Sequence, residues 1–185
     1  MSTLLELKKI TLNYKIYSTS VEVIKGIDLK INSSEKVAVV GKSGSGKTSL
    51  IMLMAGLEQP TSGDIIFDQQ LISTMNEDQL ADIRKKKIGI VFQSFYLIPN
   101  YTALENVSLI LEINSIDNPK QKAEDLLVQF GLKDRLYHFP TQLSGGEQQR
   151  VAIARSMAVS PKLILADEPT GNLDSENSQM ISNLL

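Results

Sequence analysis

The sequence predicts an α/β protein with an antiparallel β segment at its N-terminus, a mostly parallel sheet and a helical insert. Residues 4–12 and 21–31 alternate apolar and polar side chains, which is typical of half-buried strands joined by a turn. Three short, continuous apolar runs indicate strands buried on both faces of a parallel sheet: 36–40, 88–92 and 163–166. Between residues 102 and 130 only helical periodicity is found, so a helical insert interrupts the sheet.

The remaining elements follow from helical spacing and from chain breakers. Pro60 and Gly63 predict a turn into a short strand at residues 65–67. Asn118 and Pro119 divide the insert into two helices, and Pro161 ends the helix after that. Outside the insert, helices are expected at 47–57, 76–87 and 146–159.

The last residues form an apolar stripe at helical spacing, Met180, Ile181, Leu184 and Leu185, yet no helix-ending signal follows. A helix in a βαβ unit also needs a returning strand. We therefore expect a single domain that is incomplete at its C-terminus. Residues 1–92 and 160–185 would form its core, and residues 93–159 a helical subdomain.

Composition excludes several classes of protein. The chain has 185 residues with 19 Lys and Arg against 21 Asp and Glu, so no basic excess favours nucleic acid or an anionic bilayer. Cysteine is absent and histidine occurs once, which leaves carboxylates as metal ligands and suits magnesium carried by a phosphate substrate. Residues 1–14 contain no signal-peptide core, and no stretch reaches the roughly 18 apolar residues of a spanning helix.

A glycine-rich motif follows the first predicted buried strand. Residues 41–48 read GKSGSGKT and fit GxxxxGK[ST] between a strand and a helix. Glycines let backbone N–H groups wrap a phosphate at a helix N-terminus, Lys47 would reach the β and γ phosphates, and Thr48 would ligate magnesium. The competing interpretation is an ordinary glycine-rich turn.

Two consecutive carboxylates end the strand at 163–166. Open α/β sheets bind ligands at the carboxyl ends of their strands. Asp167 would hold magnesium, and Glu168 would act as general base on the attacking water. Acids that cap the next helix are the alternative. Together with the glycine-rich motif, the pair indicates an NTPase.

Residues 143–150 read LSGGEQQR. Ser144 is expected to be an N-cap, and the two glycines after it would let an anion approach the helix amides. A well-capped helix with no ligand is the alternative. This segment resembles the signature of ATP-binding cassettes, and the motifs in their order along the chain resemble those of ABC ATPases over nearly all 185 residues.

The resemblance implies a P-loop NTPase fold and an ATPase in which two chains enclose two ATP molecules with Mg²⁺. The ATP-binding positions would be Gly41, Lys42, Ser43, Gly44, Ser45, Gly46, Lys47, Thr48 and Ser49, with Tyr14 stacking on adenine. It implies that Gln93, Thr48 and Asp167 contact magnesium and that Glu168 and Gln93 are catalytic. Ser144, Gly145, Gly146 and Glu147 would complete the partner's site, and Asp174 would belong to the D-loop.

Some positions keep alternatives. Tyr14 also suits any half-buried strand end, since its ring is apolar and its tip polar. Tyr17 is the second candidate for the adenine contact. The family's switch histidine would lie beyond Leu185, and His138 precedes the signature, so it is expected to be a structural loop residue.

Residues 89–99 and 102–107 resemble the lipoprotein-release and macrolide-export group of bacterial ABC ATPases. The resemblance implies an identical ATPase partner, an integral membrane permease that docks beside Gln93, no nucleic acid, and a peripheral position on the cytoplasmic face of the inner membrane. The apolar run 95–99 would line the docking groove, or it is ordinary core.

Two alternative functions remain at this point. One is an ABC ATPase of DNA repair or translation, although no heptad run separates the motifs as a coiled-coil insertion would. The other is a fragment that binds nucleotide and does not hydrolyse it.

Overall fold

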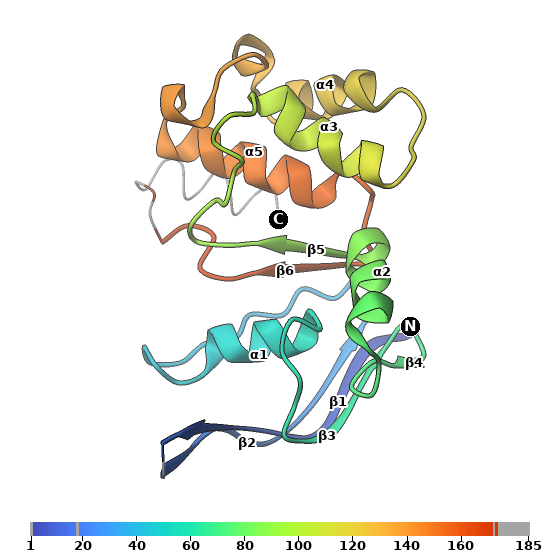
Figure 1. Ribbon diagram of the computed structural model, residues 1–185, viewed down its shortest axis with the longest axis vertical. Helices are drawn as coiled ribbons and strands as arrows, with labels where there is room; N and C mark the ends of the chain where they lie inside the picture. The colour runs from blue at the N-terminus through green and yellow to red at the C-terminus, as the bar shows by residue number, and fades with distance from the viewer. Residues whose placement is uncertain (1, 18, 172, 174–185) are drawn as a thin grey trace. The chain divides into compact units, whose positions relative to one another are not determined.

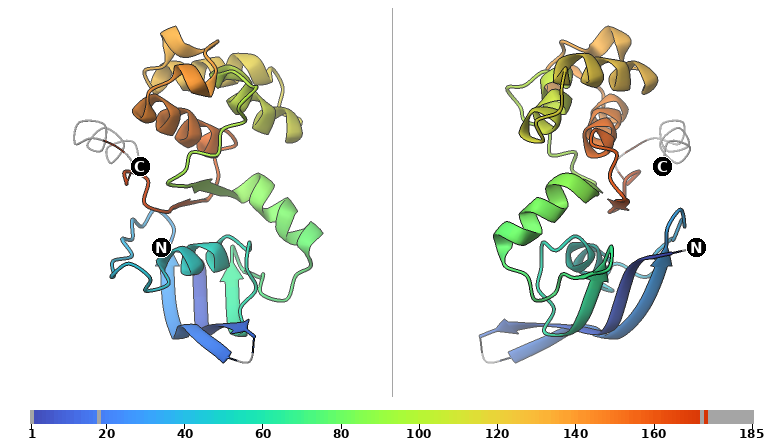
Figure 2. Two further views of the ribbon diagram at one scale, coloured as in Figure 1. Left: turned by 60° about the vertical axis from the view of Figure 1, so that its left-hand side comes forward. Right: turned by 90° about the vertical axis from the view of Figure 1, so that its right-hand side faces the viewer.

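The computed structural model describes residues 2–17, 19–171 and 173, which fall into two compact units, Met1–Arg84 and Lys85–Leu185 (Figure 1). The N-terminal unit contains an antiparallel sheet with the strand order β2-β1-β3-β4. Its strands are β1 (Thr3–Ile16), β2 (Thr19–Asn32), β3 (Ser62–Phe67) and β4 (Gln70–Leu71). Helix α1 (Lys47–Met54) lies on one face of this curved sheet (Figure 2). The antiparallel opening predicted from the alternating residues is confirmed.

A β-bulge adjusts which side chains of β1 are buried. Leu5 and Leu7 obey the two-residue alternation, and the next fully buried side chain is Ile10. The register with β2 shifts between Leu7 and Ile10, and Lys9 has a φ of 49° there. Because one extra residue is inserted, the apolar side chains stay on the core face beyond the bulge.

The strand predicted at residues 36–40 is not formed in the structure. These residues carry no regular secondary structure, and Val40 is 88% exposed. An apolar run becomes a strand only where a neighbouring strand supplies hydrogen-bond partners. The described sheet of this unit has the order β2-β1-β3-β4 and does not include the run. Helix α1 also ends at Met54, earlier than predicted.

Helix α2 (Glu77–Lys87) follows the sheet and is confirmed within one residue. Its apolar side chains Leu80 and Ile83 are buried. Arg84 pairs with Glu77 and donates from Nη1 to the Gly56 carbonyl oxygen at 2.6 Å. The helix is thereby tied to the turn that follows α1.

The C-terminal unit pairs two parallel strands with three helices. Strands β5 (Ile88–Val91) and β6 (Leu163–Ala166) match the predicted buried runs. Helices α3 (Ala103–Ile113), α4 (Pro119–Gln129) and α5 (Gly145–Met157) confirm the helical insert, and two short 3₁₀ turns, Lys133–Arg135 and Pro140–Gln142, connect α4 to α5. The helices lie together on one side of the strand pair (Figure 1).

The core of this unit is formed where the apolar faces of α3, α4 and α5 meet. It includes Val107 and Leu111 of α3, Leu127 of α4, and Val151 and Ile153 of α5, all of them buried. Helix α5 passes close to β5, since a Cβ at Gly89 would lie 2.4 Å from the Ser156 carbonyl oxygen. Glycine at position 89 therefore allows the helix to reach the strands.

The helices of this unit begin at the capping residues and the proline that the sequence places there. Thr102 and Glu105 form a capping box on α3, and Pro119 occupies the first turn of α4 after Asn118. Within the described ranges, no helix has both the length and the apolar character needed to cross a membrane. The apolar stripe at 180–185 and its predicted helix lie outside the described residues.

Candidate functional site

The predicted phosphate loop lies in the N-terminal unit and leads directly into α1. The helix after the motif is confirmed, whereas the strand expected before it is absent. Gly44 and Gly46 have φ values of 76° and 91°, in the left-handed region that favours glycine. A Cβ at Gly46 would lie 3.1 to 3.2 Å from atoms of Val23 and Ile24, so the loop packs closely on β2.

The environment of this loop suits an anion. The first turn of α1 carries no acidic residue, so its N–H groups and dipole are not offset by a nearby carboxylate. Lys47 points back over the loop and donates from Nζ to the carbonyl oxygens of Gly41 and Lys42, at 3.1 and 3.2 Å. A phosphate in the loop would therefore meet both the N-terminal amides of α1 and an ammonium group.

Tyr14 lies beside the first turns of α1. Its hydroxyl donates to Glu58 Oε2 at 3.0 Å, and it also exchanges a hydrogen bond with Ser49. Partial burial, and then the Glu58 carboxylate, raise the pKa of Tyr14 even though the Ser49 contact lowers it. The structure thus places one predicted nucleotide contact, Tyr14, next to another, Ser49. Tyr17 is fully exposed.

The C-terminal unit brings the other predicted catalytic residues together at one edge of its strand pair. Parallel β5 and β6 are paired up to Val91 and Ala166, so the segments that follow the two strands leave the sheet at the same end. Asp167 follows at once, and its N–H donates to the Val91 carbonyl oxygen at 2.9 Å. The side chain of Gln93 reaches the same turn, since a Cβ at Gly171 would be 2.8 Å from its Nε2.

Glu168 occupies an unusual backbone conformation in this turn. Its φ is 46°, and its carbonyl oxygen accepts from the N–H of Gly171 at 2.9 Å. Left-handed φ values at residues other than glycine are strained and concentrate at functional sites. Leu173 continues the turn through its N–H to the Thr170 carbonyl oxygen. Asp174 of the predicted D-loop lies outside the described residues.

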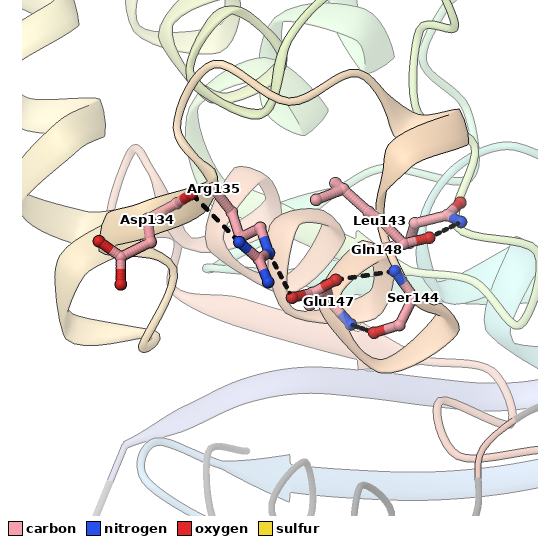
Figure 3. Close-up of polar contacts among 6 residues, drawn as sticks. All are labelled: Asp134, Arg135, Leu143, Ser144, Glu147 and Gln148. Atoms are coloured by element: carbon pink, nitrogen blue, oxygen red, sulfur yellow. Dashed lines mark hydrogen bonds and ion pairs between the residues drawn. The ribbon is translucent and has the colours of Figure 1, made fainter.

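The signature segment begins α5 as a capping box (Figure 3). Ser144 Oγ accepts from the Glu147 N–H at 3.2 Å, and Glu147 Oε2 accepts from the Ser144 N–H at 2.8 Å. Arg135 donates from Nε to Glu147 Oε1 at 2.7 Å. The predicted N-cap is confirmed. Burial would raise the pKa of Glu147, but the hydrogen bonds from Ser144 and Arg135 outweigh it and hold the pKa below its usual range.

This pKa shift predicts a pH-dependent contribution to stability. Because the folded-state pKa lies below the unfolded one, the contribution is present above the ordinary value of 4.5 and is lost as the pH falls through the folded value. Glu147→Gln keeps a capping-box residue and removes only the charge. We expect it to lower the free energy of unfolding by about 0.5 to 1 kcal/mol at pH 7. Urea unfolding at pH 7 and below pH 4 should show the difference shrinking in acid; a pH-independent difference would contradict this origin.

The segment after Gln93 is only partly core. Tyr96 is 67% exposed. The ring centroids of Phe92 and Tyr96 lie 5.2 Å apart in an edge-to-face arrangement. Leu97 packs on the helical core. Arg155 of α5 donates to the carbonyl oxygens of Phe95 and Tyr96, at 2.9 and 2.7 Å, and burial lowers its pKa. The backbone of this segment is thus fixed while Tyr96 faces outward.

Asn106 holds the other end of the same segment. It is fully buried and accepts from the Ile98 N–H at 2.8 Å. Its Nδ2 donates to carbonyl oxygens of Ile98, Tyr101 and Thr102. His138 takes part in the fold through its backbone, which links to Ala103 and Arg135. No cluster of three or more acidic, His or Cys side chains suited to a metal occurs among the residues described.

Sequence patterns alone did not identify four polar residues that fix these loops: Asn106, Arg135, Gln149 and Arg155. A usable signal existed for two of them. Asn106 and Gln149 fall on the apolar faces of helices whose neighbours Val107 and Ile153 are core residues. A polar side chain at such a position must find a partner inside the fold. Which partner it finds depends on loops distant in sequence, as with Gln149 and Pro169.

Comparisons with known proteins agree on one family. The family model described as ABC transporter matches residues 24–171. The lipoprotein-releasing system ATP-binding protein LolD of Psychrobacter arcticus is 45% identical over 100% of this chain and 83% of its own length. LolD of Syntrophotalea carbinolica is 51% identical over 89% of this chain and 74% of its own.

A larger protein and a solved structure extend the comparison. The macrolide export ATP-binding/permease protein MacB of Pasteurella multocida is 45% identical over 98% of this chain, which covers 28% of MacB. The dimeric post-hydrolysis structure of the ATP-binding cassette MJ0796, bound to ADP and Pi, is 40% identical with a TM-score of 0.91. It covers 98% of this chain and 81% of that one. The predicted α/β fold class with a P-loop is confirmed by this likeness.

Proposed function

The chain belongs to the ABC transporter family, and from this premise we propose that it binds and hydrolyses ATP to drive a bacterial membrane permease in export or lipoprotein release. It is an ABC-type ATPase. Its relatives include ATP-binding proteins of lipoprotein release and macrolide export, so an ATPase of DNA repair or translation is not favoured.

ATP binds through its phosphates at the loop 41–48. Three features support this: the left-handed glycines, the acid-free start of α1, and the ammonium of Lys47 over the loop. Gly41 to Ser49 provide the amides and hydroxyls around the phosphates, and Tyr14 contributes its ring to the adenine.

The residues proposed for magnesium fit a hard cation. Thr48, Gln93 and Asp167 offer a hydroxyl, an amide oxygen and a carboxylate, and Mg²⁺ prefers oxygen ligands of these kinds together with substrate phosphates. When bound, the ion neutralises charge on the transferring phosphate. The protein's part is to hold these oxygens in place, which for Asp167 is supported by its backbone bond to β5.

The observation that carries the hydrolytic function is the position of Gln93 beside the turn that contains Asp167 and Glu168, at the carboxyl ends of β5 and β6. Gln93 orients the attacking water and Glu168 accepts its proton. The γ-phosphoryl group passes to the water oxygen as its bond to the β–γ bridging oxygen breaks, and ADP leaves with that oxygen. Two carboxylates at one strand end thereby take different roles, one toward the ion and one toward the water.

A second copy of the chain completes each site. The signature residues Ser144 to Glu147 start α5 with two glycines, so the first-turn amides of Gly145 and Gly146 can approach a phosphate on the other copy. Asp174 belongs to the same interface. The solved MJ0796 relative, which is described as dimeric, supports this arrangement.

The membrane partner docks on residues 95–99. Arg155 and Asn106 fix the backbone of this segment, and exposed Tyr96 offers an aromatic surface for a short permease helix. The chain therefore works peripherally on the cytoplasmic face of the inner membrane, without nucleic acid. The choice between lipoprotein and macrolide cargo lies with the permease.

Phosphate release from ATP tests this function. The purified protein, with and without its permease, should release phosphate from ATP in the presence of Mg²⁺ and lose that activity in excess EDTA. If the protein binds ATP but releases no phosphate in the presence of Mg²⁺, either alone or with its permease, the assignment as an ATPase would be overturned.

A further inference from the structure

Gln149 is a fully buried polar residue that connects α5 to a loop 20 positions away. Its exposed fraction is 0%, and its Nε2 donates to the Pro169 carbonyl oxygen at 2.8 Å. The amide orientation follows from this contact, because the reversed group would set two acceptor oxygens against each other. The helix on which Gln149 lies is the one that begins with the signature.

Among the residues that the structure describes, only the donor half of this amide has a partner. Within the described chain, Gln149 Oε1 is buried and accepts no hydrogen bond. A buried acceptor left unpaired costs free energy, and packing alone would be better served by an apolar side chain of the same size. The bond from Nε2 to Pro169 is therefore the reason for a glutamine here.

Pro169 directly follows the strained Glu168. Asp167 is fixed on one side by its bond to Val91, and the turn closes on the other through Gly171 N–H to the Glu168 carbonyl oxygen. A non-glycine residue at a φ of 46° needs surrounding contacts to stay there. Of the contacts just described, the bond from Gln149 is the one that ties this turn to α5.

We propose that Gln149 is a positioning residue, which holds the Glu168 turn against the signature helix so that the carboxylate is aimed at the attacking water. The inference rests on the proposed role of Glu168 as general base. It also links the two motifs physically: a displacement of α5 at its signature end is transmitted to the Pro169 carbonyl and hence to Glu168.

Gln149→Leu tests the proposal by removing the donor and keeping an apolar side chain of similar bulk. We expect kcat for ATP to fall on the order of 10- to 100-fold, as a small misplacement of a catalytic group can cause. KM and the titrated ATP affinity should stay within about twofold, since the interaction acts on the chemical step. Ser156→Ala is the matched control, because in the described part of the chain this half-buried hydroxyl on α5 donates to the helix carbonyl oxygen of Ile153 alone. Its kcat should equal that of the wild type.

A purely structural role would give another result. The melting temperature and the fraction of active protein would fall, whereas kcat per folded molecule would not change; that result, or an altered KM at constant kcat, would overturn the proposal. If Gln149→Leu fails to fold, Gln149→Asn serves as the second variant, because it keeps the amide but shortens the side chain by one methylene, so that its N–H group falls short of the Pro169 carbonyl oxygen. It should give the same loss of kcat. A wild-type protein without hydrolysis would refute the proposed function itself, whereas hydrolysis unaffected by either substitution would refute this inference alone.

Discussion

Glu168→Gln should lower ATP turnover by on the order of 10² to 10⁴ while ATP binding is preserved. The substitution keeps the shape of the side chain and replaces the carboxylate, the proposed acceptor of the attacking water's proton, with an amide that cannot take this role. The phosphate loop belongs to the other unit of the chain and is unchanged. Phosphate release measures the first effect, and titration with Mg-ATP the second.

Glu112→Gln provides the matched control for this experiment. Glu112 is an exposed residue of α3, so the same change of charge occurs in the same unit and away from the β5–β6 turn. Its turnover should equal that of the wild type. Unchanged turnover in Glu168→Gln would contradict the assignment of the general base and, with it, the roles proposed for the turn 167–171.

Lys47→Ala should abolish or greatly weaken the binding of Mg-ATP. The ammonium now held by the Gly41 and Lys42 carbonyl oxygens lies over the loop, and its loss leaves the phosphates with the loop's backbone N–H groups and hydroxyls but without this charge. A charge-assisted hydrogen bond to a buried anion contributes about 1.5 to 3 kcal/mol, so affinity should fall by at least about tenfold. Titration calorimetry or a fluorescent nucleotide measures the change.

Lys36→Ala removes the same charge from an exposed position of the same unit. It should leave the affinity for Mg-ATP as in the wild type. Equal affinities for wild type and Lys47→Ala would show that the loop is a glycine-rich turn and not a phosphate site.

Elements with strong local signals were predictable from the sequence. Alternation gave β1 and β2, helical stripes bounded by Pro119 and Pro161 gave the helices, and Ser144 marked the start of α5. These features depend on neighbours within a few residues, so the chain itself contains the information. The carboxyl-end rule predicted a site at Asp167 and Glu168, whereas Gln93 was named only through the resemblance to ABC ATPases.

Features that depend on distant partners were not predictable. The run at 36–40 is as apolar as a buried strand, yet strand formation also requires a paired neighbour, which the described sheet of its unit does not give it. The bonds of Gln149 to Pro169 and of Arg155 to Phe95 join segments far apart in the chain, and no spacing rule covers them. They become visible only when α5 has been placed against both loops.

In the proposed dimer, two copies of the chain enclose ATP between the phosphate loop of one and the signature of the other. Light scattering on Glu168→Gln, with and without Mg-ATP, detects this dimer, because a protein blocked at hydrolysis should accumulate in the closed form. We expect the molar mass of this variant to be that of one chain without nucleotide and to double when Mg-ATP is added. A variant that binds Mg-ATP by titration and keeps the mass of one chain would contradict the proposed dimer.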